Sequence, residues 1–260
     1  MARHSAPRKL GAATRIALAL VGAVALSVPS VFARPGGEAA RVAVGASGTI
    51  VATADGGKTW TTRTSGTTLD LRAVSCAGAQ RCVVVGNYAG STPAVILATQ
   101  NGGATWTVQS SGVTDTMFSV SCPSATMCVA TGQGGEILTT NDGGATWHER
   151  TTNTDAYLQS VSCSTTSRCV AAGFYVATAG VAPGSWAIVA SKDGGATWAS
   201  PAKSSIAGVL YGEMLTRSVS CPTSNTCFVL GGGNLTAPGD DLLATHDGGA
   251  TWSRASGPKG

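Results

Sequence analysis

The chain has 260 residues, of which 43% are hydrophobic and 12% are charged, so it is long and apolar enough for one packed domain or two small ones, and disorder is excluded. Its formal net charge is +4, but four of the 17 basic residues lie in the first 33 positions, which leaves 13 basic against 13 acidic residues in the remainder. A formally neutral chain has no electrostatic attraction to nucleic acid or to an anionic membrane, so neither is expected as a partner.

The first 33 residues have the layout of a secretory signal peptide. A basic start is followed by an uninterrupted run of apolar and small residues over 16–26, which is too short to span a bilayer comfortably. We predict cleavage after Ala33, with cleavage after Ala25 as the alternative. The folded domain is therefore expected over 34–260, in a bacterial protein that is secreted or held at the cell surface, with no membrane insertion beyond the signal segment.

All eight cysteines fall into four pairs with five residues between the partners. Each first Cys follows Val-Ser, and each second Cys opens a short apolar run that ends in Gly. Because identical local sequences imply identical local bonds, we predict four disulfides, each joining the two strands of a hairpin in an oxidising compartment. Each is worth about 2 kcal/mol by loop closure. The predicted pairs are Cys76–Cys82, Cys122–Cys128, Cys163–Cys169 and Cys221–Cys227.

Metal binding is the alternative use of these cysteines. Zinc sites favour two to four residues between ligands and usually add His, whereas five residues separate each pair here and only His148 and His246 follow the signal segment. No metal and no other cofactor is therefore expected.

A second short phrase occurs five times, in strict alternation with the cysteine pairs; one copy is TNDGGATW, at 140–147. Its glycines supply the positive φ angles of a tight turn, its Asp and Thr can bond turn amides, and its Trp can anchor the turn in a core. One Asp per copy is too few for a calcium loop. We interpret the copies as structural joints, at Asp55 and Trp60, Asn101 and Trp106, Asp142 and Trp147, Asp193 and Trp198, and Asp247 and Trp252.

The segments between the two repeats are short, rich in β-branched residues and without a helical period. One unit contains four such segments, at 71–76, 81–86, 94–99 and 105–110, which we name strands A to D of an antiparallel meander. A four-stranded repeat of 41 to 54 residues is typical of a β-propeller blade. We therefore predict an all-β fold, a β-propeller of about five four-stranded antiparallel blades.

The two ends of the chain do not determine whether this ring closes. The segment at 40–45 aligns with strand B of the next unit, so strand A of the first blade would be 30–33, which cleavage after Ala33 would remove. The last blade ends with its own strand D at 251–256, so no spare strand is available to complete the first blade. An incompletely closed propeller is one expected outcome.

The phrase at 140–147 resembles the Asp-box, or bacterial neuraminidase repeat, whose pattern is Ser/Thr, any residue, Asp, any residue, Gly, any residue, Thr, Trp. All five copies fit, except that Asn101 replaces the Asp. The resemblance implies a propeller of the superfamily that includes sialidases, sortilin-type receptors and photosystem II assembly factors, in which this turn lies away from the active site. The Val-Ser-Cys hairpins are most similar in style to secreted actinobacterial propellers.

An antiparallel meander places the A–B and C–D turns at one end of each blade and the B–C and D–A loops at the other. The A–B turns with the cysteine pairs and the C–D turns with the repeated phrase therefore share one face, and the variable loops share the other. Amphipathic aromatic side chains on such loops are typical of binding surfaces, although packing of the loops onto the propeller is the plainer alternative. The predicted partner-binding residues are Tyr88, Tyr157, Tyr175, Trp186 and Tyr211.

These features favour a secreted or cell-surface binding module without catalytic residues, whose partner is an unidentified protein or glycan; the oligomeric state stays open. A sialidase-like glycoside hydrolase is one alternative, but the Phe-Arg-Ile-Pro motif that the resemblance implies is absent, and no His or unpaired Cys is available for a nucleophilic triad. An assembly factor resembling the photosystem II propellers is the other, although the positively charged patch expected in that family is not evident.

Overall fold

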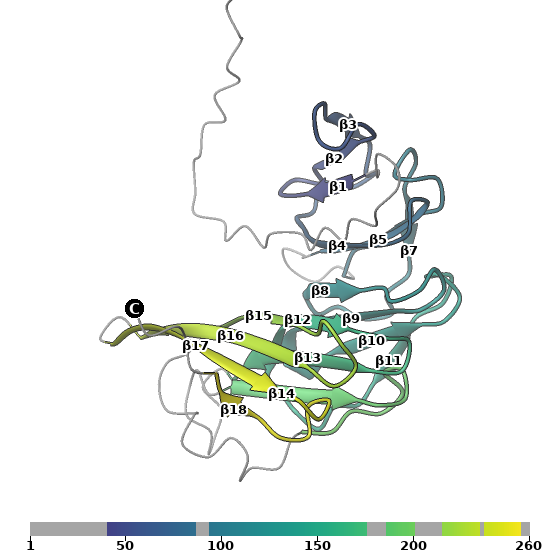
Figure 1. Cartoon of the computed structure of the whole chain (residues 1–260). Helices are drawn as coiled ribbons and strands as arrows, with labels where there is room; N and C mark the ends of the chain where they lie inside the picture. Colours follow the sequence, from purple (N-terminus) through teal and green to yellow (C-terminus); the bar gives the residue numbers. More distant parts are fainter. Residues whose placement is uncertain (1–40, 87–93, 176–185, 201–214, 235–236, 256–260) are drawn as a thin grey trace, which may run out of the picture.

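A computed structural model describes residues 41–86, 94–175, 186–200, 215–234 and 237–255 of the chain. These residues form eighteen strands and one short 3-10 turn, η1 (Gln133–Gly135). The strands build five antiparallel sheets that follow one another along an arc (Figure 1). The prediction of an all-β fold with about five blades is confirmed. We number the sheets blade 1 to blade 5 in chain order.

Each blade takes its strands from one continuous stretch of chain. The strands are β1 (Arg41–Val44), β2 (Ile50–Thr53) and β3 (Thr61–Arg63) in blade 1; β4 (Leu71–Ala77), β5 (Arg81–Gly86), β6 (Ile96–Thr99) and β7 (Thr107–Gln109) in blade 2; β8 (Met117–Ser121), β9 (Cys128–Gly132), β10 (Ile137–Thr140) and β11 (His148–Arg150) in blade 3; β12 (Tyr157–Cys163), β13 (Cys169–Phe174) and β14 (Trp186–Ser191) in blade 4; and β15 (Leu215–Ser220), β16 (Cys227–Asn234), β17 (Ala237–Thr245) and β18 (Ser253–Arg254) in blade 5.

Every sheet pairs its strands in chain order, as a meander does. Blades 2, 3 and 5 have four strands. Blade 4 has three, and its fourth segment is reduced to a bridge between Ala190 and Ala199. Blade 1 also has three, because the described residues begin at its strand B and the predicted strand A at 30–33 lies outside them.

The hydrophobic core lies between successive blades. Side chains alternate between the two faces of a strand, so each sheet has a leading face toward the preceding blade and a trailing face toward the following one. In β13, Ala171 packs toward blade 3, whereas its neighbours Val170 and Ala172 pack toward blade 5. Four core clusters of this kind join blades 1 and 2, 2 and 3, 3 and 4, and 4 and 5.

The four predicted disulfides are all present, and they account for all eight cysteines. In each bond the two Cα atoms lie 4.0 to 4.1 Å apart. Cys76 lies directly opposite Cys82 in the A–B hairpin of blade 2, and Cys163 lies opposite Cys169 in blade 4. Each bond therefore joins the first two strands of its blade at the A–B turn.

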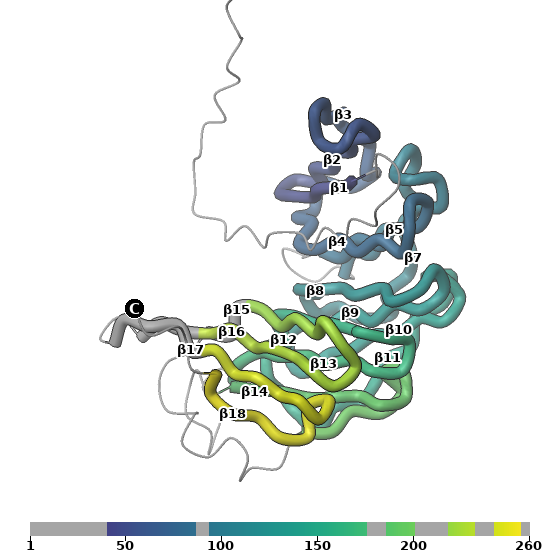
Figure 2. The backbone as a smooth tube through the Cα atoms, viewed as in Figure 1, coloured from purple at the N-terminus to yellow at the C-terminus, as the bar shows by residue number. Residues whose placement is uncertain are grey.

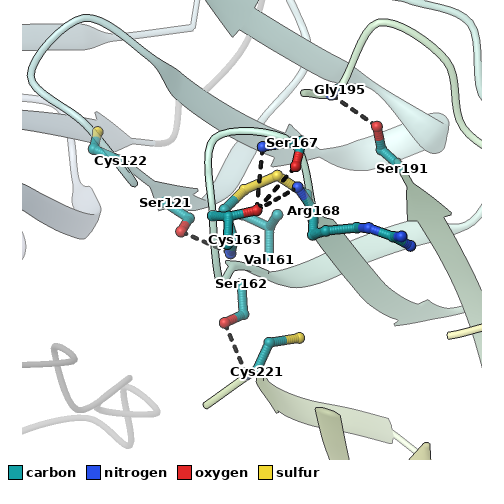
Figure 3. Close-up of a disulfide and its surroundings, with 12 residues drawn as sticks. Ser121, Cys122, Val161, Ser162, Cys163, Ser167, Arg168, Ser191, Gly195 and Cys221 are labelled. Atoms are coloured by element: carbon teal, nitrogen blue, oxygen red, sulfur yellow. Dashed lines mark hydrogen bonds between the residues drawn. A yellow bond between two sulfur atoms is a disulfide. The ribbon is translucent and has the colours of Figure 1, made fainter. Parts of the chain in front are cut away.

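Serine hydroxyls connect the innermost strands of neighbouring blades. The Oγ of Ser121 in blade 3 accepts the backbone N–H of Cys163 in blade 4 at 3.0 Å, and the Oγ of Ser162 in blade 4 accepts that of Cys221 in blade 5 at 3.0 Å (Figure 3). Ser75 in blade 2 does the same for Cys122 in blade 3 at 2.9 Å. The Ser of the first three Val-Ser-Cys segments thus satisfies an amide of the next blade.

The arc formed by the described residues does not close into a ring. The β1–β3 sheet and the β15–β18 sheet lie apart at its two ends (Figure 2), and no core cluster of the described residues joins them. Trp198 and Trp252 pack against the blades that precede theirs and are 7% and 4% exposed, whereas Trp60 of blade 1 is 46% exposed. The expectation that the Trp anchors its turn in a core therefore does not hold for Trp60, because no described blade precedes blade 1.

Candidate functional site

The C–D turns use their polar side chains to hold their own backbone. In blade 3, the Thr140 hydroxyl donates to Asp142 Oδ1 at 2.7 Å and accepts the N–H of Gly144 at 2.9 Å. Asp142 also accepts the N–H and the hydroxyl of Thr146, at 2.9 and 2.5 Å. Both carboxylate oxygens are therefore engaged inside the turn, which supports a structural role rather than a ligand site.

The same bonds lower the pKa values of these carboxyl groups. The side-chain hydrogen bond from Thr146, followed by the backbone bond from the same residue, holds the pKa of Asp142 well below its usual range. The equivalent bonds from Thr197 lower the pKa of Asp193 to about 2. A carboxylate that accepts several hydrogen bonds is stabilised in its charged form, so these groups stay ionised and are poor candidates for proton transfer at neutral pH.

The A–B and C–D turns share one face, as predicted. The N–H of Gly143 in the C–D turn of blade 3 donates to the carbonyl of Thr126 in its A–B turn at 2.8 Å, and Gly194 does the same to Ser167 in blade 4 at 3.0 Å. This face is therefore a continuous set of structural joints.

The B–C and D–A loops meet on the opposite face. Gly135 of η1, in the B–C loop of blade 3, donates its N–H to the carbonyl of Ala156 at 2.7 Å. Its φ is +78°, and a Cβ there would lie 1.8 Å from the carbonyl oxygen of Thr154. Only glycine allows this approach. The loop that carries Glu136 is thereby held against the loop that leads into blade 4.

A cavity of about 620 Å³ lies between these two loops. The Tyr175 hydroxyl lies 3.1 Å from Thr154 Oγ1, which fixes the ring at the wall, and the ring packs partly against the core between blades 3 and 4. Charged groups from neighbouring elements complete the wall. They are Glu136, Glu149, Arg150 and Asp155.

Glu136 is the unusual group of this cavity. Its Oε1 atom is buried and has no hydrogen-bond partner. Burial, and secondarily the nearby charges of Glu149 and Asp115, raise the pKa of Glu136 to about 7. Loss of hydration and like charges both disfavour the ionised carboxylate, so this group titrates near neutral pH. Sequence reasoning missed it, because a single Glu after a Gly-rich loop gives no signal of burial.

Tyr157 belongs to a row of rings that joins blades 3 and 4. Its ring centroid lies 6.0 Å from that of Phe118 in blade 3 and 5.9 Å from that of Phe174 in blade 4. The guanidinium carbon of Arg72 in blade 2 lies 5.6 Å from the Phe118 centroid, within the range of a cation–π contact. Phe118 and Phe174 were not among the predicted binding residues. Both occupy half-buried strand positions next to buried ones.

The structure brings together two of the five predicted binding residues, Tyr157 and Tyr175, near the same loops. Trp186 requires a correction: it is 3% exposed and packs in the core between blades 4 and 5, because it begins β14 on the trailing face of that sheet. It presents no surface to a partner. Tyr88 and Tyr211 lie outside the described residues.

Other features of the described residues offer less to a ligand. A cavity of about 400 Å³ lies among the C–D turns of blades 4 and 5, and Lys192 is the one charged residue in its wall. No three His, Cys, Asp or Glu side chains of the described ranges gather closely enough to hold a metal ion. Across those same ranges, no helix has the length and apolarity needed to cross a membrane.

The fold was compared with those of known proteins. No protein-family model matches the chain, and no curated protein matches its sequence. Among solved structures, the GH74 xyloglucanase from Xanthomonas campestris aligns with 80% of this chain and 34% of its own, with TM-score 0.54 and 13% identity. An ancestral GH74 enzyme aligns over 80% and 30%, with TM-score 0.56 and 15% identity.

The fold is that of a β-propeller. The propeller spans about a third of the length of those two GH74 enzymes. YCF48 bound to a D1 peptide aligns with 84% of this chain and 77% of its own, with TM-score 0.45 and 19% identity. At such identities these likenesses concern the fold alone, so function has to be argued from the site.

Proposed function

We propose that this propeller is a secreted, non-catalytic binding module whose protein or glycan partner binds at the cavity between the B–C loop of blade 3 and the D–A loop of blade 4. The observation that carries the proposal is that Tyr175 and two carboxylates, Glu136 and Glu149, line one cavity of about 620 Å³. Binding sites commonly combine an aromatic body with a few oriented polar groups.

The charge of the cavity narrows the chemistry of the partner. Glu136, Glu149 and Asp155 line it with a single cation, Arg150, and the Nε of that Arg already donates to Thr139 Oγ1 at 2.8 Å. Carboxylate oxygens accept hydrogen bonds from hydroxyl groups and attract cations. The cavity therefore favours a neutral, hydroxyl-rich glycan or a basic peptide segment, and disfavours an anionic sugar such as sialic acid.

A glycan array that contains neutral and sialylated glycans, probed in parallel with a set of basic peptides, tests this proposal on the disulfide-intact protein. We expect binding to neutral glycans or to basic peptides and none to sialylated glycans, with affinity falling at least tenfold in Tyr175→Ala and in Glu149→Gln. Tyr175→Phe separates the ring from its hydroxyl and should lose less. Val108→Ala is the control, because Val108 is exposed at 64% on the outer strand of blade 2. Unchanged affinity in both cavity variants would contradict the assignment.

One observation favours glycoside hydrolysis as a second candidate. A carboxyl group with a pKa of about 7, Glu136, beside a second carboxylate is the combination by which many glycosidases supply a general acid and a base or nucleophile. Turnover of neutral fluorogenic glycosides by the native chain, abolished in Glu136→Gln, would replace the binding module with an enzyme. Binding without turnover would reject this candidate.

A further inference from the structure

We propose that the two ends of the blade arc bind each other between copies of the chain, so that the trailing face of blade 5 in one molecule packs on the leading face of blade 1 in the next. This association is independent of ligand binding at the Tyr175 cavity. It continues the series of contacts that already joins the five blades within one molecule.

The four internal interfaces provide the template, because each uses the same parts. The following blade contributes the Trp of its C–D turn, and the preceding blade contributes apolar side chains from strands B and C of its trailing face. Trp252 of blade 5 packs in this way in a cluster with Val170 and Ile188 of blade 4. Where strand A is described in both neighbouring blades, a serine hydroxyl of the preceding blade also accepts a backbone N–H of the following blade.

Blade 1 has the side chains that a following blade contributes to such an interface, but no described residue packs against them as a preceding blade would. Its Trp60 is 46% exposed, whereas Trp252, at the equivalent position of blade 5, is 4% exposed. Ala43 and Val51 share the leading face with Trp60, because they alternate with Val42 and Ile50, which pack toward blade 2. Both are only half-buried.

Arg41 stands on the same face, where the other blades have their second cysteine. Its Nε is buried and has no hydrogen-bond partner among the described residues. A buried donor without a partner is costly. An acceptor contributed by a neighbouring molecule would satisfy it.

Blade 5 has, on its trailing face, the apolar side chains that a preceding blade contributes to such an interface. Phe228 and Leu230 of β16 alternate with the buried Cys227 and Val229 and therefore lie on the trailing face, where both are half-exposed. Val170 and Ala172, at the equivalent positions of blade 4, are buried under blade 5.

Ser220, the serine of the Val-Ser-Cys segment in blade 5, also has no neighbouring blade to bond among the described residues. Ser220 is exposed, and no described amide donates to its hydroxyl, whereas Ser162 at the equivalent position bonds Cys221 of the next blade. The hydroxyl of Ser220 is thus an acceptor on the same face that offers Phe228 and Leu230.

The two open faces are opposite halves of one interface, so neither is complementary to itself. They lie apart at the two ends of the arc (Figure 1), so the trailing half of one molecule reaches a leading half on a second molecule. Such a head-to-tail contact is heterologous and can repeat, giving rings or short open chains rather than a two-fold dimer.

Sedimentation velocity of the purified, disulfide-intact protein over a hundredfold range of concentration tests the association. We expect the mass to rise in multiples of one chain. Trp60→Ser and Phe228→Asp should each raise the midpoint concentration at least tenfold, and Val108→Ser should leave it unchanged, since Val108 is exposed on no end face. A single-chain mass throughout the range would overturn the proposal.

A mixing experiment tests the head-to-tail geometry. Trp60→Ser keeps an intact trailing face, and Phe228→Asp keeps an intact leading face. Their equimolar mixture should form a two-chain species that grows no further, while each variant alone stays single. Leu230→Lys replaces Phe228→Asp if thermal melting shows that the latter is unfolded. A mixture that stays monomeric while the native chain associates would overturn this geometry.

Discussion

The hydroxyl of Ser162 in blade 4 lies 3.0 Å from the backbone nitrogen of Cys221 in blade 5 and accepts its N–H (Figure 3). Cys221 is buried, so no solvent replaces this acceptor. The bond explains why Ser precedes the first Cys of each pair, a repetition for which the sequence alone suggested no role. Together with the equivalent bonds of Ser75 and Ser121, it also means that blades 3, 4 and 5 each depend on the previous blade for a backbone hydrogen bond.

Replacement of Ser162 should therefore weaken the contact between blades 4 and 5. We expect Ser162→Ala to reduce the free energy of unfolding by about 1 to 2 kcal/mol, because it leaves a buried amide unpaired. Ser220→Ala is the matched control: the same motif residue has no following blade and should change stability by less than about 0.5 kcal/mol. Urea denaturation at low protein concentration measures both, and equal losses would show that the effect does not come from the contact between blades.

The repeated tryptophans should differ in what their indole nitrogens contribute. Trp198 Nε1 donates to the carbonyl of Gly195 at 3.0 Å, whereas Trp147 Nε1 is buried without a partner. Trp198→Phe should therefore cost about 1 kcal/mol more than Trp147→Phe, since only the first loses a hydrogen bond. Melting temperatures of the two variants test this, and a larger loss in Trp147→Phe would contradict it.

The C–D turns should make stability depend on acid. The pKa of Asp193 is about 2 in the folded chain and ordinarily 3.8, so its contribution is complete above pH 4 and is lost as the pH falls toward 2. Asp193→Ala should lose about 1 to 2 kcal/mol at pH 7. The loss should shrink below pH 4, which denaturation at pH 7, 4 and 2.5 would show.

Asp193→Asn provides the matched control for that carboxyl group. In blade 2 an Asn already fills the same position: Asn101 Oδ1 accepts the N–H of Thr105 at 2.9 Å, and its Nδ2 donates to the Thr105 hydroxyl at 2.8 Å. The Asn variant should therefore be more stable than the Ala variant at pH 7. If the two were equally destabilised, the side-chain bonds would not be the source of the turn's stability.

Glu136 should have the opposite pH dependence. Its pKa is about 7 in the folded chain against an ordinary 4.5, so the folded state binds more protons within that window and stability falls as the pH rises through it. Glu136→Gln removes this loss. The free energy of unfolding of this variant should exceed that of the native chain by nearly zero at pH 4 and by about 1 kcal/mol at pH 8, after allowance for solvent screening of a half-buried group.

Glu149→Gln checks the cause of that shift. Removing the neighbouring charge should lower the pKa of Glu136 and move the window of falling stability to lower pH, without abolishing it, because burial is the larger cause. Denaturation of the three proteins between pH 4 and 8 gives the comparison. An unchanged window in Glu149→Gln would show that the two carboxyl groups do not interact.

Much of the fold could be predicted because its repeats are local. The disulfide of Cys163 and Cys169 closes across six positions of sequence, and the bonds of Asp142 reach no farther than Thr146. Strand order and the assignment of turns to faces followed from the meander alone. The candidate site was less predictable: Tyr175 was identified by residue type, whereas the buried environment of Glu136 depends on a loop from another blade.

The sequence by itself determined the units of this protein, since each hairpin, turn and disulfide is formed by residues close together in the chain. Only the tertiary structure decided what each unit contacts. Trp60 and Trp252 occupy the same place in the same phrase, yet one is exposed and the other is buried. The physical reason is that side-chain burial depends on the neighbouring blade, and Trp252 has a preceding blade to pack against, whereas Trp60 has none among the described residues.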